Sequence, residues 1–217
     1  GDNTVMTAEQ MKAVADAVKA LAAPATVDFS EVVYESETFP NSFKSNANLA
    51  GIVFPQNVTK TASAAFQKTG MTSVTLLKGI SYGSNAFDSC ASLVSVTVEE
   101  GVTEIGNYMF QNTKLTDVTL PNSVTKIGAS AFNGCSLTTI NFGQGVKTIE
   151  NSAFQNCGEL TEIILPDATE TLGQNAFGDC PKLAKISLGK NMKTLEAYCF
   201  VGYSKGCPLL GDIICRA

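Results

Sequence analysis

The sequence predicts an α/β solenoid, a stack of similar coils that a helix closes at its N-terminal end. The first observation is a phenylalanine that returns every 21 to 23 residues, at Phe43, Phe66, Phe87, Phe110, Phe132, Phe154, Phe177 and Phe200. The second is a run of alternating apolar residues after each ring, and the third is one amphipathic stretch before the first repeat. A fixed period of twenty-odd residues is typical of solenoids, whose repeats each pack on their neighbours.

The amphipathic stretch predicts a helix from about residue 8 to residue 22. Thr7 and Gln10 fit a capping box, in which each side chain accepts a hydrogen bond from the other residue's backbone N–H. Pro24 ends the pattern. Apolar residues recur at helical spacing within it, at Met11, Val14, Val18 and Leu21. We expect this apolar side to cover the first coil, although a helix that docks on a partner is the alternative.

The chain divides into a cap, residues 1–42, and a solenoid, residues 43–217. The cap is expected to hold the helix and, over residues 25–42, a degenerate first coil, because Val27 and Phe29 alternate as they would in a strand. An uncovered terminal coil exposes a strand edge and an open core, so a solenoid needs such a cap.

Each repeat carries the signature of a strand. An aliphatic residue stands five or six positions after the ring, and an alternating pair follows three positions later, as in Leu115, Val118 and Leu120. The unit reads L-x-x-[IV]-x-[LVF], which is the strand signature of a leucine-rich repeat. A second apolar pair, such as Val124 and Ile127, predicts a short second strand. The few residues left before the next ring predict a single helical turn.

The repeat resembles the BspA-like leucine-rich repeat family, most clearly in the stretch Leu115-Thr-Asp-Val-Thr-Leu-Pro-Asn-Ser-Val-Thr-Lys-Ile-Gly-Ala-Ser-Ala-Phe-Asn-Gly-Cys135. The resemblance covers about residues 43–215, with seven or more copies. It implies a leucine-rich-repeat solenoid, strand-dominated and shaped as a right-handed horseshoe or arc. Family members are typically bacterial or protist cell-surface proteins implicated in adhesion to host or matrix proteins. The family motif is structural, so the resemblance implies a binding scaffold and transfers no catalytic residue.

Composition argues against several function classes. Fifteen basic residues against twenty acidic ones give a net charge of −5, which disfavours nucleic acid and anionic membranes as partners. The sequence has no run of eighteen apolar residues, so we expect no membrane insertion by this segment. It begins with Gly1 and shows no signal peptide. We expect that an export signal has been removed and that the protein is secreted or on the cell surface.

The sequence predicts neither an enzyme nor a cofactor. It contains no histidine, which rules out triads that use one, and it has no G-x-G-x-x-G or P-loop motif. Four carboxylates could in principle pair as in a glycosidase, namely Glu99, Glu100, Asp117 and Glu162. Such a pair needs a cleft and one raised pKa, so we expect these residues to be solvated surface instead.

Seven cysteines predict structural thiols and no metal site. Four stand three positions after a ring, where other coils have Asn or Thr: Cys90, Cys135, Cys157 and Cys180. Their wide spacing is unlike that of zinc ligands, and buried cysteine behaves as a small hydrophobe. Cys199 precedes a ring, Cys215 is expected on the inward side of the last strand, and Cys207 falls outside the repeat. A disulfide between Cys199 and Cys207 is an open alternative.

The outward strand residues are the candidate binding face, since they line the concave side of a horseshoe. The candidates are Ser73, Ser95, Asp117, Thr119, Thr139, Asn141, Glu162 and Lys185. Most of them are short and polar, whereas interface hot spots favour Trp, Tyr and Arg. They could equally be residues that suit a solvated sheet, or a ladder that adds an extended partner.

The function that these observations favour is a non-catalytic secreted or cell-surface protein that binds other proteins. Its partner would be a host or matrix protein that the sequence does not identify. One alternative is a carbohydrate-binding module, which usually needs aromatic platforms that the candidate face lacks. Another is a structural spacer that displays a further domain.

Overall fold

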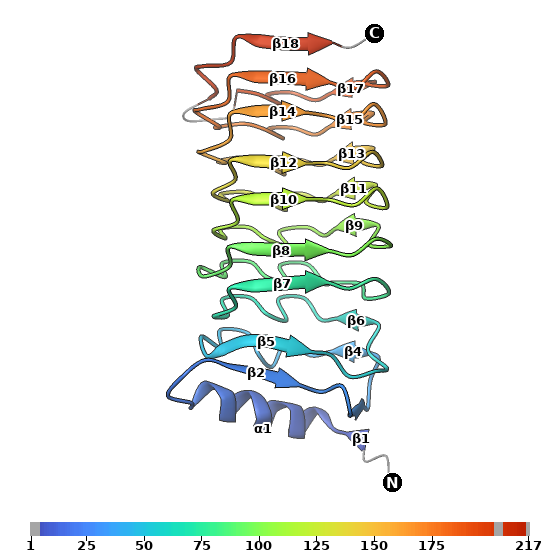
Figure 1. Ribbon diagram of the computed structural model, residues 1–217, viewed down its shortest axis with the longest axis vertical. Coiled ribbons are helices and arrows are strands. Elements are labelled where there is room, and N and C mark those ends of the chain that lie inside the picture. Colours follow the sequence, from blue (N-terminus) through green and yellow to red (C-terminus); the bar gives the residue numbers. More distant parts are fainter. Residues whose placement is uncertain (1–4, 202–205, 216–217) are drawn as a thin grey trace.

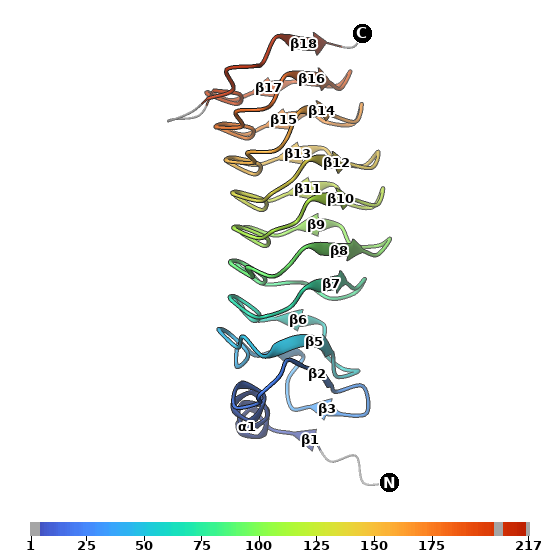
Figure 2. The same cartoon turned by 60° about the vertical axis from the view of Figure 1, so that its left-hand side comes forward.

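The structure is a computed structural model that describes residues 5–201 and 206–215. Its coils stack into an upright column with the one helix at the N-terminal end (Figure 1). A second view, turned by 60°, shows that most coils have a longer strand, a short second strand and a narrow turn (Figure 2). The coil that begins with β7 (Ser73–Leu76) has no second strand, only an isolated bridge between Lys60 and Ser81. The column has little curvature in either view. The predicted leucine-rich-repeat solenoid is confirmed.

Helix α1 (Ala8–Lys19) begins at the predicted capping box. The backbone N–H of Gln10 donates to Oγ1 of Thr7 at 3.3 Å, and the N–H of Thr7 donates to Oε1 of Gln10 at 2.9 Å. Met11, Ala15 and Val18 are buried, so the helix packs its apolar side on the first coil as predicted. The two reciprocal bonds satisfy donors that a helix start leaves open.

The helix ends at Lys19, three residues before the predicted position, and Leu21 is 45% exposed rather than packed on the core. The first coil explains the early end. The side-chain amide of Asn48 donates to the carbonyl oxygens of Lys19 and Leu21, at 3.0 and 2.9 Å. The buried Asn46 amide likewise donates to the carbonyl oxygen of Ala15 at 2.9 Å. Two asparagines therefore attach the helix to the solenoid.

The longer strands run parallel along one side of the column, which we name the long-strand face (Figure 1). They are β2 (Ala25–Asp28), β5 (Leu49–Val53), β7 (Ser73–Leu76), β8 (Ser95–Val98), β10 (Asp117–Thr119), β12 (Thr139–Asn141), β14 (Glu162–Ile164), β16 (Lys185–Leu188) and β18 (Asp212–Cys215). Equivalent residues pair in register, as Val118 does with Ile140. The ladder is interrupted, since the hydrogen-bonded groups are β2-β5, β7-β8, β10-β12 and β14-β16-β18.

The predicted short second strand is present and forms what we name the rear sheet. Its strands are β4 (Thr38–Phe39), β6 (Lys60–Thr61), β9 (Glu104–Ile105), β11 (Lys126–Ile127), β13 (Thr148–Ile149), β15 (Thr171–Leu172) and β17 (Thr194–Leu195). The last five form one parallel sheet, and β4 pairs with β6. In the cap, β1 (Val5–Met6) pairs with β3 (Val33–Tyr34), and β2 forms the degenerate first coil that pairs with β5.

The predicted helical turn before each ring is wrong. Each full coil instead places two residues in the left-handed region, two positions before and two positions after the ring, such as Ser130 and Gly134 around Phe132. In this conformation every second N–H of the turn points along the column, and those of Ser130 and Gly134 donate to the carbonyl oxygens of Asn151 and Gln155. The N–H of Phe132 therefore donates to the carbonyl oxygen of Ala153 in the next coil at 2.8 Å. The turns form a third hydrogen-bonded ladder between coils, which a helix could not provide.

The eight periodic rings form a continuous spine, as predicted. From Phe66 to Phe200 each ring stacks on the next, with centroids 5.2 to 6.4 Å apart and planes within 21°. Phe39, which lies off the period, inserts between Phe43 and Phe66 and stacks on both. All of these rings are fully buried except Phe200, which is half-buried near the C-terminal end. The spine is the centre of a single hydrophobic core.

The cysteine column is buried as predicted, and its thiols bridge neighbouring coils. The Cys157 thiol donates to the carbonyl oxygen of Phe132 at 3.3 Å, and Cys180 donates to that of Phe154 at 3.2 Å. Cys207 was expected outside the repeat, but its thiol donates to the carbonyl oxygen of Phe177 at 3.2 Å and so belongs to the column. All seven cysteines are free, so the alternative disulfide is absent.

Cys215 is exposed, which corrects its predicted inward burial. It pairs in register with Leu188 of the preceding coil. Among the described residues no coil packs beyond β18, so inward-facing positions of this strand stay open to solvent. Ile213 of the same strand is 51% exposed for this reason.

Candidate functional site

The predicted binding residues all lie on the long-strand face. Seven of the eight are exposed, and Lys185 is half-buried. They form two parallel columns, because strand register places Asp117 opposite Thr139, Thr119 opposite Asn141, and Glu162 opposite Lys185. Their role in binding stays a prediction.

Several of these side chains contact one another rather than standing free. The Thr139 hydroxyl donates to Asp117 at 2.7 Å, and this bond lowers the pKa of the Asp117 carboxyl below its usual value. Lys185 pairs with Glu162 at 2.6 Å, which raises the pKa of the lysine. A glycosidase acid needs a raised carboxyl pKa, so the shift at Asp117 has the wrong sign for that chemistry. The two pairs are exposed and contribute little to stability.

A cleft of about 390 Å³ opens in the long-strand face between β5 and β7, where the strand ladder is interrupted. We name it the front cleft. Gly51 and Val53 of β5 and Ser73 and Thr75 of β7 line it, with Phe54 also contributing to its wall. Predicted candidate Ser73 therefore lies at the edge of a cavity, and Val53 is 41% exposed there. The front cleft offers an apolar surface beside short hydroxyl side chains.

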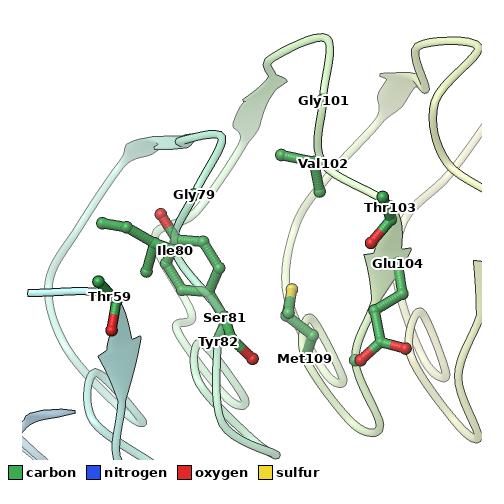
Figure 3. A pocket seen from close by; sticks show the side chains of 11 residues that line it. Thr59, Gly79, Ile80, Ser81, Tyr82, Gly101, Val102, Thr103, Glu104 and Met109 are labelled. Carbon is green, nitrogen blue, oxygen red and sulfur yellow. The ribbon is translucent and has the colours of Figure 1, made fainter. Parts of the chain in front are cut away.

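A second cleft, of about 300 Å³, lies on the rear side of the column, between residues 79–82 of the coil that contains β7 and residues 101–109 of the next coil (Figure 3). We name it the rear cleft. Ile80 and Tyr82 line one side, and Val102, Glu104 and Met109 line the other. Val102 and Met109 are buried, whereas Glu104 is exposed. The rear cleft thus has an apolar interior and a carboxylate toward solvent.

One short coil accounts for the rear cleft. The coil that ends at Phe87 has 21 residues, the shortest of the seven intervals between rings. Eight positions before the ring it has Gly79, where the next two coils have Val102 and Val124. Gly79 has a φ of +82°, and a Cβ there would meet no atom within 4 Å. The side chain that fills this column elsewhere is missing, and a cavity takes its place.

Tyr82 takes the position that Ile105 holds in the next coil, and its ring is held firmly. Its centroid lies 6.4 Å from that of Phe54 and 5.9 Å from that of Phe87. Its hydroxyl accepts a hydrogen bond from the backbone N–H of Leu77 at 3.1 Å. Burial raises the pKa of Tyr82 to about 12, so the phenol stays neutral at physiological pH.

The rear ladder stops at this coil. Farther along the column, the N–H of Thr125 donates to the carbonyl oxygen of Thr103, and that of Gly128 to Ile105, both at 2.8 Å. The equivalent N–H groups of Thr103 and Gly106 have no such partner among the described residues, and β9 is the end strand of the five-stranded sheet. The rear cleft therefore has an open strand edge along one wall.

The described residues contain no group of three or more His, Cys, Asp or Glu side chains that could hold a metal ion. No helix within residues 5–201 and 206–215 is long and apolar enough to cross a membrane.

The two clefts were missed by the sequence reasoning, although a signal existed. The 21-residue interval and the glycine in a column of valines both mark the irregular coil. Neither feature shows on which side the stack would open, because that depends on how neighbouring coils compensate. In the core, the Tyr82 ring fills part of the space that the shorter coil leaves. The two sheets stay open beside this coil.

The sequence matches the family model of the BspA type leucine rich repeat region, in six copies, over residues 26–82 and 80–206. The chain belongs to the BspA-type leucine-rich repeat family. The match begins in the cap, so the first coil of this repeat protein is also part of the repeat array. No curated protein sequence matches the chain.

Two solved structures illustrate the shared fold. A leucine rich cell surface protein of Faecalibacterium prausnitzii A2-165 matches 88% of this chain at 22% identity, with a TM-score of 0.59. A leucine-rich repeat protein of Eubacterium ventriosum ATCC 27560 matches 89% at 21% identity, with a TM-score of 0.57. This BspA-type chain spans 60% and 66% of the length of those two proteins. At such identity the likeness shows a shared fold.

Proposed function

We propose that the protein is a non-catalytic scaffold on a bacterial cell surface that binds a host or matrix protein through its long-strand face. The observation that carries the proposal is the combination of a rigid stacked core with a broad exposed row of short polar side chains. Rigid elements present contact residues at low entropic cost. Membership of the BspA-type family supports the proposal, and so does the cell-surface title of the F. prausnitzii protein.

The long-strand face has features suited to contact with another protein. It offers hydroxyl and amide groups in register, one charged pair between Glu162 and Lys185, and isolated exposed aliphatics such as Ile164, which is 57% exposed. The front cleft adds a concave surface where an apolar side chain of the partner could insert. No aromatic ring stands among the eight candidate residues, which disfavours sugar binding as the main activity of this face.

The test is binding of the purified chain to immobilised fibronectin, laminin and collagen, followed by variants. Thr119→Arg with Asn141→Arg places two large charges side by side on the face. The matched control, Thr148→Arg with Thr171→Arg, places two charges on register partners of the rear sheet. We expect binding to at least one matrix protein with a dissociation constant on the order of 1 μM, reduced only by the first variant. Absence of binding, or equal loss in both variants, would overturn the proposal.

A further inference from the structure

We propose that the rear cleft is a binding site for one arginine side chain of a protein partner. This inference rests on the proposed protein-binding function but uses the opposite side of the column from the long-strand face. It extends that function by naming a second contact and its chemistry. The shape of the rear cleft, its charge and its open backbone groups all favour this ligand.

The shape suits a long side chain with an apolar stem. The rings and chains of Ile80, Tyr82, Val102 and Met109 bound the interior from two facing coils (Figure 3). Arginine buries its methylene stem along such surfaces and keeps its charged end near polar groups. The Tyr82 ring, fixed by its neighbours and by Leu77, is also a surface on which a guanidinium can stack.

The negative charge in the rear cleft favours a cationic ligand. Glu104 is the only charged residue among those that line the rear cleft. Lys126 is the register partner of Glu104 and pairs with Glu150 at 2.9 Å, and its hydrogen bond to Glu150 and the charges of Glu150 and Glu104 raise the pKa of Lys126. Glu104 itself makes no ion pair within 4.0 Å in the described part of the chain. The protein's net charge of −5 adds a weak long-range attraction for a basic partner.

The backbone groups suit arginine better than lysine. In a continuous rear sheet, the carbonyl oxygens of Ile80 and Tyr82 would accept from Thr103 and Gly106, and here those bonds are absent among the described residues. The open carbonyl oxygens and the Glu104 carboxylate together provide acceptors on both sides of the opening. A guanidinium carries five donors in a planar fork and can use several acceptors at once, whereas an ammonium is a compact point charge.

The experiment is an NMR titration of the isotope-labelled chain with the blocked tripeptide acetyl-Gly-Arg-Gly-amide. The matched probe has citrulline in place of arginine, which keeps the shape and removes the charge. We expect shifts confined to residues 79–82 and 101–109, a dissociation constant on the order of 1 mM, and no comparable shifts with citrulline. The lysine tripeptide should bind more weakly than the arginine one.

Two variants locate the site. Glu104→Gln should weaken binding about tenfold, and Thr103→Trp should abolish it by filling the opening. The controls are Glu170→Gln and Thr194→Trp, which make the same changes at half-buried and exposed rear positions away from the cleft, and both should bind as the unchanged chain does. Amide spectra of each variant confirm that the fold is retained.

Several outcomes overturn the inference: no shifts at residues 79–82 and 101–109, equal binding of the citrulline probe, or equal effects of the variants and their controls. Each is separable from failure of the proposed function. A chain that binds a matrix protein through Thr119 and Asn141 but ignores the tripeptide would keep the long-strand face and lose the rear cleft. A chain that binds the arginine tripeptide but no matrix protein would support the rear cleft as an arginine site and contradict the proposed role of the long-strand face.

Discussion

The rings of Phe154 and Phe177 stack with centroids 5.2 Å apart and planes only 6° from parallel, although the two residues lie 23 positions apart in the chain. Contacts of this kind repeat along the column and are fully shielded from water. Because each coil contacts only its neighbours, the stability of the column is a sum of coil terms and interface terms.

Removing a ring from the middle of the spine should therefore cost more than removing one at its end. We expect Phe132→Ala or Phe154→Ala to lower the free energy of unfolding by about 3–5 kcal/mol. Phe200→Ala should cost clearly less, because that ring is half-buried and stacks at 6.4 Å on one neighbour only among the described residues. Denaturant unfolding followed by circular dichroism measures both. Equal costs would contradict the spine.

The left-handed turn residues predict a second stability effect. Ser130 has a φ of 53°, and its N–H donates to the carbonyl oxygen of Asn151 at 2.9 Å. A β-branched side chain is strained in this conformation, so Ser130→Val should destabilise the fold by about 1–2 kcal/mol. Ser130→Gly relieves the strain and should leave thermal stability nearly unchanged. A glycine variant as unstable as the valine variant would show that the serine side chain, not the backbone, matters.

The buried thiols predict a loss of stability at alkaline pH. Burial raises the pKa of Cys135 to about 11 and of Cys180 to about 12, above the 9.0 that is usual for a solvated thiol. Below pH 9 the thiols are protonated in both states, and above it only the unfolded chain releases the protons. Stability should fall between pH 9 and about 12, by up to about 1.4 kcal/mol per thiol and pH unit.

The control for this pH effect is to replace both thiols by threonine. Thr69 and Thr113 already stand in the same column, and the Thr113 hydroxyl donates to the carbonyl oxygen of Phe110 at 2.9 Å. The Cys135→Thr, Cys180→Thr variant should show a shallower decline above pH 9 in chemical unfolding. An unchanged slope would mean that other groups cause the alkaline loss.

The accessibility of the thiols tests both the packing of the column and the exposure of its C-terminal strand. Cys215 is exposed, and Cys90, Cys135, Cys157, Cys180 and Cys199 are buried. A colorimetric thiol reagent should react quickly with Cys215, slowly with the half-buried Cys207, and with the other five only after unfolding. Cys215→Ser should remove the fast phase. Rapid reaction of five or more thiols in the native protein would contradict the packed column.

The period of the rings was enough to predict the spine, and the apolar alternation after each ring predicted the two strand columns. The capping helix followed from its own capping box and helical spacing of apolar residues. Phe39 was not predicted as part of the spine, since it lies four positions before Phe43 and off the period. The left-handed turns were also missed. Ser and Asn fill most of these positions, and Asn is enriched in the left-handed region, but Ala, Lys and Tyr fill others, so the residue preference is too weak to mark every turn.

The candidate site could be predicted only in part. The exposed polar columns follow from strand alternation, which is a local property. The clefts do not, because they arise where one coil is a residue or two shorter than its neighbours and the stack must absorb the difference. The Tyr82 ring fills part of the space in the core. The strand pairing is interrupted between β5 and β7 on the front and next to β9 on the rear.

The open ladder beside β9 is the feature on which the rear cleft depends, and native-state amide hydrogen exchange measures it directly. Thr103 and Gly106 should exchange at least about tenfold faster than Thr125 and Gly128, the equivalent residues of the next coil, because only the latter pair is hydrogen-bonded to the preceding coil. Equal protection of the two pairs would show that the rear sheet is continuous and that the cleft is closed.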